Sequence, residues 1–233
     1  MTIAGINGTI LAALIRYRVV GPPMTDVLVP GGRDVRGTLE EPDGETNAIV
    51  VACPPHPQHG GSRSDGRLIA VSDALVEAGI ACLRFDYGPW DEGYGEREDV
   101  RNVIRWARSE DRFGGAGADG FPVGVFGYSF GGSLALLAAA DIDGTAAVSA
   151  LAPTARLADD LDAVAALDRI ESPVQICYGE RDSTVDWKPV VDRAREHDDE
   201  VTPLPGDHFF VGQNAKIADE VSTFFEGAVL QSP

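Results

Sequence analysis

Lysine is nearly absent from this chain. Only Lys188 and Lys216 are lysines among 19 basic residues, while 37 residues are acidic, and the formal net charge over 233 residues is −18. Binding to nucleic acid or to an anionic membrane surface depends on clustered Lys and Arg. A charge of this sign and size therefore argues against nucleic acid and membranes as partners.

Cysteine is also scarce. Cys53, Cys82 and Cys177 each lie in or at the end of an apolar, strand-like run, and no two of them form a CxxC pair. We expect reduced, buried thiols in a cytoplasmic protein, with no disulfide framework and no cysteine-based metal site. The spacing of His56 and His59 is HxxH, but neither an HExxH helix nor converging carboxylates accompany it, so we expect no metal and no cofactor.

No apolar run is long enough to span a bilayer. Residues 3–15 are mildly apolar but short, and no basic segment precedes them. Met24 offers a second plausible start, so residues 1–23 are interpreted as a possible extension or as an N-terminal strand and turn, with a weak secretory signal as a further alternative. We expect residues 24–233 to form a single domain.

The chain instead contains alternating strand-like and helix-like segments. Short apolar runs predict strands, and apolar residues at helical spacing, ended by signals such as Gly79, predict the helices between them. The predicted strands are 48–53, 80–85, 122–126, 146–151, 174–178 and 200–204, and the predicted helices are 66–79, 96–109, 130–140, 157–167, 188–196 and 213–225. Such alternation predicts an α/β fold, with a mostly parallel sheet covered by helices on both faces. Residues 151–170 leave room for at most a short lid.

A G-x-S-x-G motif occurs at residues 127–131, Gly-Tyr-Ser-Phe-Gly. A predicted strand leads into it and an Ala-rich helix leads out, which is the context in which this motif places a nucleophilic serine on a tight turn. The glycines let the strand and helix approach each other. Ser129 is therefore the candidate nucleophile, and an incidental serine in a glycine-rich turn is the alternative.

A nucleophilic serine needs a histidine to take its proton and a carboxylate to orient that histidine. Downstream of Ser129, His208 lies in a Gly-rich loop before the last helix, whereas His197 lies in a hydrophilic helix end. Chain order and loop position favour His208 as the base. Asp182, in the loop after strand 174–178, is the candidate acid, with Glu180 and Asp186 as neighbouring alternatives.

The oxyanion of such a reaction needs two N–H donors. Phe130, directly after the serine, is the first candidate. The loop after strand 48–53 reads Cys-Pro-Pro-His-Pro-Gln, and its prolines have no N–H, so His56 is the second candidate, with Gln58 as the alternative. Trp90 and Tyr94 could line an acyl pocket or serve only as aromatic anchors of a loop.

The combination of these motifs resembles the α/β-hydrolase superfamily, in particular its small members related to dienelactone hydrolase and to compact prolyl-oligopeptidase-like serine hydrolases. The shared features are the segments 56–62, 84–86, 127–131, 179–182 and 206–210. The sequence departs from dienelactone hydrolases proper, which use a cysteine nucleophile, and it has prolines where many relatives carry a His-Gly pair.

This resemblance implies a serine hydrolase that cleaves a small ester, thioester or amide with Ser129, Asp182 and His208. A small acyl compound is then the expected partner, and neither metal nor cofactor is required. The alternatives are a binding protein that kept the fold but lost the chemistry, and an acyltransferase. Dense Asp, Glu and Arg with almost no Lys further resembles the surfaces of halophilic proteins, and an ordinary acidic cytoplasmic protein is the other interpretation.

Overall fold

The structure, a computed structural model, describes residues 24–113 and 121–230. The proposed extension at residues 1–23 lies outside the described residues. The strands are β1 (Met24–Val29), β2 (Val35–Glu40), β3 (Ala48–Cys53), β4 (Ile80–Asp86), β5 (Val123–Tyr128), β6 (Ala147–Leu151), β7 (Arg156–Ala158), β8 (Leu161–Asp162), β9 (Val174–Gly179) and β10 (Glu200–Leu204). The α-helices are α1 (Gly66–Glu77), α2 (Tyr94–Ser109), α3 (Phe130–Ala139), α4 (Ala163–Leu167), α5 (Lys188–Glu196) and α6 (Asn214–Val229), and two 3₁₀ turns cover Pro57–His59 and Asp111–Phe113.

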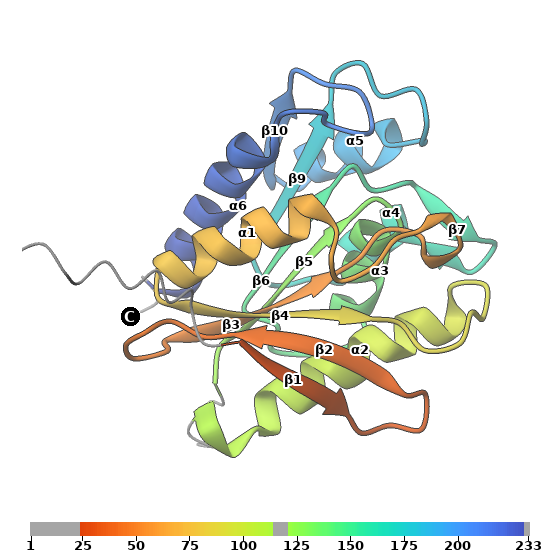
Figure 1. Ribbon diagram of the computed structural model, residues 1–233. Helices are drawn as coiled ribbons and strands as arrows, with labels where there is room; N and C mark the ends of the chain where they lie inside the picture. The colour runs from red at the N-terminus through yellow and green to blue at the C-terminus, as the bar shows by residue number, and fades with distance from the viewer. Residues whose placement is uncertain (1–23, 114–120, 231–233) are drawn as a thin grey trace, which may run out of the picture.

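Eight strands form one sheet in the order β1-β2-β4-β3-β5-β6-β9-β10 (Figure 1). The pairs β1–β2 and β2–β4 are antiparallel, and all other pairs of this sheet are parallel. The predicted mostly parallel α/β sheet is confirmed. Because parallel strands end at the same edge, the loops after β3, β5 and β9 gather at one rim.

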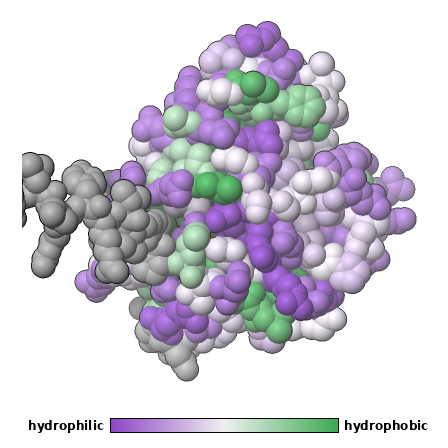
Figure 2. All heavy atoms as spheres, viewed as in Figure 1, coloured by the Kyte–Doolittle hydropathy of each residue, from purple (hydrophilic) through white to green (hydrophobic). Residues whose placement is uncertain are grey.

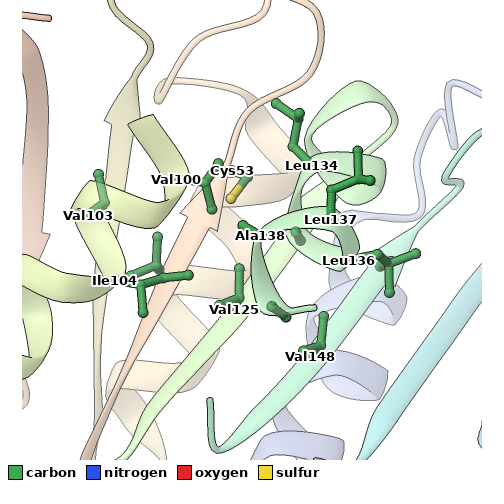
Figure 3. Close-up of a cluster of buried hydrophobic side chains, with 14 of the residues drawn as sticks. Cys53, Val100, Val103, Ile104, Val125, Leu134, Leu136, Leu137, Ala138 and Val148 are labelled. Atoms are coloured by element: carbon green, nitrogen blue, oxygen red, sulfur yellow. The ribbon is translucent and has the colours of Figure 1, made fainter. Parts of the chain in front are cut away.

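Helices cover both faces of the sheet. Helices α1 and α6 pack together on one face, over a cluster that includes Val50, Phe126 and Phe225. Helices α2, α3, α4 and α5 pack on the other face, where α2 and α3 contribute side chains to the same buried cluster as β3, β5 and β6 (Figure 3). The labelled members include Val100, Val103 and Ile104 of α2, Leu134, Leu136 and Leu137 of α3, and Cys53, Val125 and Val148 of the strands. The inner strands are buried on both faces, which explains why β3 reads as an unbroken apolar run.

The predicted helix over residues 157–167 is wrong in its first half. Strands β7 and β8 form a short antiparallel hairpin, and only Ala163–Leu167 is helical. Leu157 and Leu161 lie four residues apart, which suits a helix. An Arg156–Asp162 ion pair across the hairpin and an Asp162 side chain that caps α4 favour the observed arrangement.

The visible face is largely hydrophilic, with small separate apolar patches (Figure 2). Within the described residues, no helix combines the length and apolar character that a membrane span requires.

Candidate active site

Ser129 occupies the turn between β5 and α3 with a backbone φ of 57°. A positive φ is costly for a residue with a side chain, and such strain is typical of functional turns. Gly127 and Gly131 make the turn possible: a Cβ on Gly127 would lie 2.1 Å from the Gly131 carbonyl oxygen, and one on Gly131 would lie 2.3 Å from that of Cys53. The local sequence therefore presents the Ser129 hydroxyl at the rim of the sheet.

The structure brings the predicted base and acid to this hydroxyl. The Ser129 Oγ lies 2.8 Å from His208 Nε2, and His208 Nδ1 lies 2.7 Å from Asp182 Oδ2. Both His208 and Asp182 are buried, whereas Ser129 is partly exposed. A buried carboxylate beside Nδ1 holds the ring in the tautomer whose Nε2 can accept the serine proton.

The alternatives considered for these roles lie elsewhere. Glu180 and Asp186 are exposed, and the backbone of Asp186, through its carbonyl, accepts a hydrogen bond from Ala155. His197 follows the end of α5, where its Nε2 lies 3.3 Å from Asp168. Of the candidate acids and bases, Asp182 and His208 are the ones placed next to Ser129.

Several further residues hold the acid and the base, and the sequence analysis missed them. The Thr184 amide donates to Asp182 Oδ1 at 2.8 Å, and Trp187 Nε1 donates to the Asp182 carbonyl at 2.9 Å. The Tyr128 hydroxyl donates to the His208 carbonyl at 2.8 Å. The only sequence signal for these residues was proximity: Tyr128 lies within the G-x-S-x-G motif, and the other two follow Asp182 closely.

The two predicted oxyanion donors lie on adjoining segments. The close approach of Gly131 to the carbonyls of Cys53 and Pro54 sets the start of α3 against the loop that carries His56. Within the described part of the chain, the amides of His56 and Phe130 donate no hydrogen bond, whereas the Gln58 amide donates to His56 Nδ1 at 3.3 Å. The amides of His56 and Phe130 thus have no acceptor among the described residues, as the predicted oxyanion role requires.

A cavity of about 560 Å³ opens at Ser129, and we refer to it as the serine cavity. Besides Ser129 and His208, its walls include His56, Phe130, Thr154, Leu157, Val185 and Phe209. Among its described lining residues, histidines aside, the charged ones are Asp65 and Arg67, and these pair with each other. Arg67 also donates to the Phe209 carbonyl at 2.8 Å, so its guanidinium is already engaged by the protein.

Trp90 and Tyr94 line a second cavity of about 420 Å³. It shares His56, Phe130 and Leu157 with the serine cavity, so the two adjoin. The structure therefore places these two aromatic residues in a cavity that adjoins the one at Ser129.

The three cysteines are buried and free, and burial raises the pKa of each thiol above its ordinary value. A protonated, inaccessible thiol is a poor nucleophile. Across the described ranges, no group of three or more His, Cys, Asp or Glu side chains is placed to hold a metal ion.

The sequence model of the dienelactone hydrolase family matches residues 116–200. A comparison with curated proteins finds no match.

Solved structures with the same fold include an α/β serine hydrolase homologue from Coxiella burnetii, with 25% identity and a TM-score of 0.72 over 86% of this chain and 96% of that one. A serine hydrolase without a lid from Xanthomonas campestris is 21% identical, with a TM-score of 0.73 over 90% of this chain and 97% of that one. A dienelactone hydrolase from Anabaena variabilis is 24% identical, with a TM-score of 0.72 over 89% and 99% of the two chains.

Proposed function

We propose that this chain, which has the fold of the α/β serine hydrolases, is an esterase-like hydrolase that cleaves small, uncharged esters, thioesters or amides through an acyl-Ser129 intermediate. One observation carries the proposal: Ser129, His208 and Asp182 form a continuous hydrogen-bonded series at the rim of the sheet, open to the serine cavity.

The reaction begins when His208 Nε2 takes the Ser129 proton as Oγ attacks the substrate carbonyl carbon. The amides of His56 and Phe130 donate to the oxyanion of the tetrahedral intermediate, and the start of α3 adds partial positive charge there. His208 then gives its proton to the leaving alcohol, thiol or amine as the bond to carbon breaks. Water, deprotonated by His208, repeats the attack and releases the carboxylic acid and the free serine.

The charge around the site favours an uncharged substrate. The Asp65–Arg67 pair leaves no uncompensated cation among the described residues that line the serine cavity. The molecule as a whole carries −18, which lowers the local concentration of anions. An ester that carries an additional carboxylate would be repelled by the negative net charge of the protein, and it would find no unpaired cationic side chain among the described residues of the serine cavity.

The test replaces the nucleophile. We expect Ser129→Ala to lower kcat/KM for p-nitrophenyl acetate by at least about 10³-fold and to abolish labelling by a fluorophosphonate probe, because both need the Ser129 hydroxyl. Ser64→Ala is the matched control, since Ser64 is an exposed serine in the loop before α1. Circular dichroism shows whether each variant folds.

Each rival function gives its own result. Wild-type turnover in a folded Ser129→Ala variant contradicts the proposal. A folded wild-type protein that neither labels nor turns over an ester is a binding protein instead. An added alcohol or thiol that outcompetes water for the acyl group, measured by mass spectrometry of the products, identifies an acyltransferase.

A further inference from the structure

The cavity beside the serine cavity has aromatic walls, and we refer to it as the side cavity. Its apolar and aromatic lining comprises His56, Trp90, Tyr94, Phe130, Leu157 and Ala158. Three rings meet in this lining: the His56 centroid lies 4.6 Å from that of Trp90 and 4.8 Å from that of Phe130, and Trp90 and Phe130 are 5.8 Å apart. Such a surface favours a flat apolar group, which gains both area burial and ring–ring contact.

The charged groups of the side cavity do not favour an anionic ligand. Arg156 pairs with Asp162 across the β7–β8 hairpin, and Glu92 lies exposed at the rim. The His56 ring favours its neutral form, because partial burial and the neighbouring His59 lower its pKa. An anion would be repelled by Glu92, and Arg156, which could offset that repulsion, is already paired with Asp162.

The Trp90 wall is held in place by hydrogen bonds to the backbone of its loop. Arg33 donates from Nη2 to the Pro89 carbonyl at 2.5 Å and from Nε to the buried Asp99 at 2.7 Å. The buried Glu96 carboxylate accepts from the amides of Asp91 and Gly93, each at 2.8 Å. Trp90 is therefore carried by an anchored loop, and its position in the side cavity is preorganised for binding.

The opposite wall is tied to the same loop region. Leu157 and Ala158 belong to β7, and the Tyr94 hydroxyl donates to Asp160 Oδ1 at 2.6 Å between the two strands of that hairpin. The two walls of the side cavity are thus joined by a hydrogen bond between residues that are 66 positions apart in sequence.

The position of the side cavity decides which part of a substrate it can hold. It shares His56 and Phe130, the proposed oxyanion donors, with the serine cavity, but His208 and Phe209 line only the serine cavity. The leaving group must lie beside His208, because that ring supplies its proton. Because the side cavity adjoins the serine cavity at His56 and Phe130 and not at His208, it is separate from the place of the leaving group, which leaves it available to the acyl group.

We propose that the side cavity is the acyl subsite of this enzyme and that it selects uncharged acyl groups ending in an aromatic ring, such as phenylacetyl or 3-phenylpropionyl groups. This inference rests on the proposed function, since it names the acyl group that Ser129 receives.

The experiment compares acyl groups on one leaving group, using p-nitrophenyl acetate, phenylacetate and 3-phenylpropionate. Ala158 and Trp90 line the side cavity but not the serine cavity. Ala158→Trp is designed to fill the side cavity, and Trp90→Ala removes one of its aromatic side chains. We expect the wild type to prefer at least one aryl-acyl ester to acetate in kcat/KM. Each variant should lower the ratio of aryl-acyl to acetate kcat/KM at least about tenfold. Ala165→Trp, at an exposed alanine of α4, is the matched control.

Two results overturn the subsite while the proposed function stands. In the first, acetate is hydrolysed, but the wild type shows no preference for aryl-acyl esters or both variants keep that preference. In the second, the variants change the rate with a different leaving group, measured with 1-naphthyl acetate, and do not change the preference among acyl groups. If the folded wild type hydrolyses none of these esters and takes up no fluorophosphonate, the proposed function fails and the subsite fails with it. Ala158→Trp adds a side chain to the side cavity and Trp90→Ala removes one. If one variant does not fold, the other still tests the subsite.

Discussion

Tyr128 precedes Ser129 in the chain and also binds the loop that carries His208. Its hydroxyl donates to the His208 carbonyl at 2.8 Å, and the Arg67 guanidinium lies 4.1 Å from its ring centre while donating to the carbonyl of Phe209. Burial raises the pKa of Tyr128 to about 12, so its hydroxyl remains a donor throughout the neutral range. Two successive carbonyls of the base loop are thus held by side chains that stack on each other.

At this scale we expect Tyr128→Phe to lower kcat for p-nitrophenyl acetate about three- to tenfold with little change in KM, because the base then lies less accurately beside Ser129 Oγ. Tyr178→Phe is the matched control: the Tyr178 hydroxyl only accepts an exposed hydrogen bond from Arg195. Steady-state kinetics and thermal melts separate the two effects. A lower melting temperature with an unchanged kcat would show that Tyr128 stabilises the fold without positioning the base.

Among the elements, the contact between α3 and β3 determines where the site forms. Gly131, in the first turn of α3, lies so close to the end of β3 that a Cβ there would be 2.3 Å from the Cys53 carbonyl oxygen and 2.4 Å from that of Pro54. This approach sets the Phe130 amide beside the loop of His56. Any larger residue would push the helix away from the strand.

We therefore expect Gly131→Ala to lower kcat/KM at least about 100-fold and to destabilise the protein by several kcal/mol, since backbone atoms on both sides would have to move. Gly227→Ala is the control, because that glycine lies within α6 and its added Cβ would contact nothing within 4 Å. Alanine there is expected to be neutral or to stabilise by up to about 1 kcal/mol. Equal melting temperatures and activities for the two variants would contradict the role given to Gly131.

For the whole molecule the dominant feature is its charge. A net charge of −18 disfavours the compact state through self-repulsion, and the hydrophilic surface in Figure 2 is consistent with many of these charges lying outside the core. Salt shortens the screening length from about 10 Å at 0.1 M to about 3 Å at 1 M.

We expect the melting temperature to rise by at least about 5 °C between 0.05 and 1 M KCl, measured by circular dichroism, because screening removes repulsion that unfolding would relieve. Sucrose at matched osmolality is the control for effects of water activity. A flat or falling melting temperature in KCl would contradict the interpretation of this surface as adapted to salt.

Much of the architecture follows from local patterns in the sequence. Apolar runs such as Ala48–Cys53 predicted their strands because a strand buried on both faces has no polar side to show, and the order of strands and helices predicted the parallel sheet. The Gly127–Gly131 motif and chain order identified Ser129, Asp182 and His208 as candidates, and the fold places both Ser129 and Asp182 within hydrogen-bonding distance of His208. These signals are readable because each depends on spacing within a few residues or on sequence order.

Only the tertiary structure decided the contacts between segments far apart in the chain. The anchoring of the Trp90 loop by Arg33, the bond from Tyr94 to Asp160 and the hairpin where a helix was expected all depend on which surfaces meet after folding. Periodicity carries no information about such meetings, because any of the many acidic residues could pair with any arginine until the sheet fixes their distance. The sequence by itself determined the chemistry available at the rim of the sheet, and the packing around it determined the cavities in which that chemistry can act.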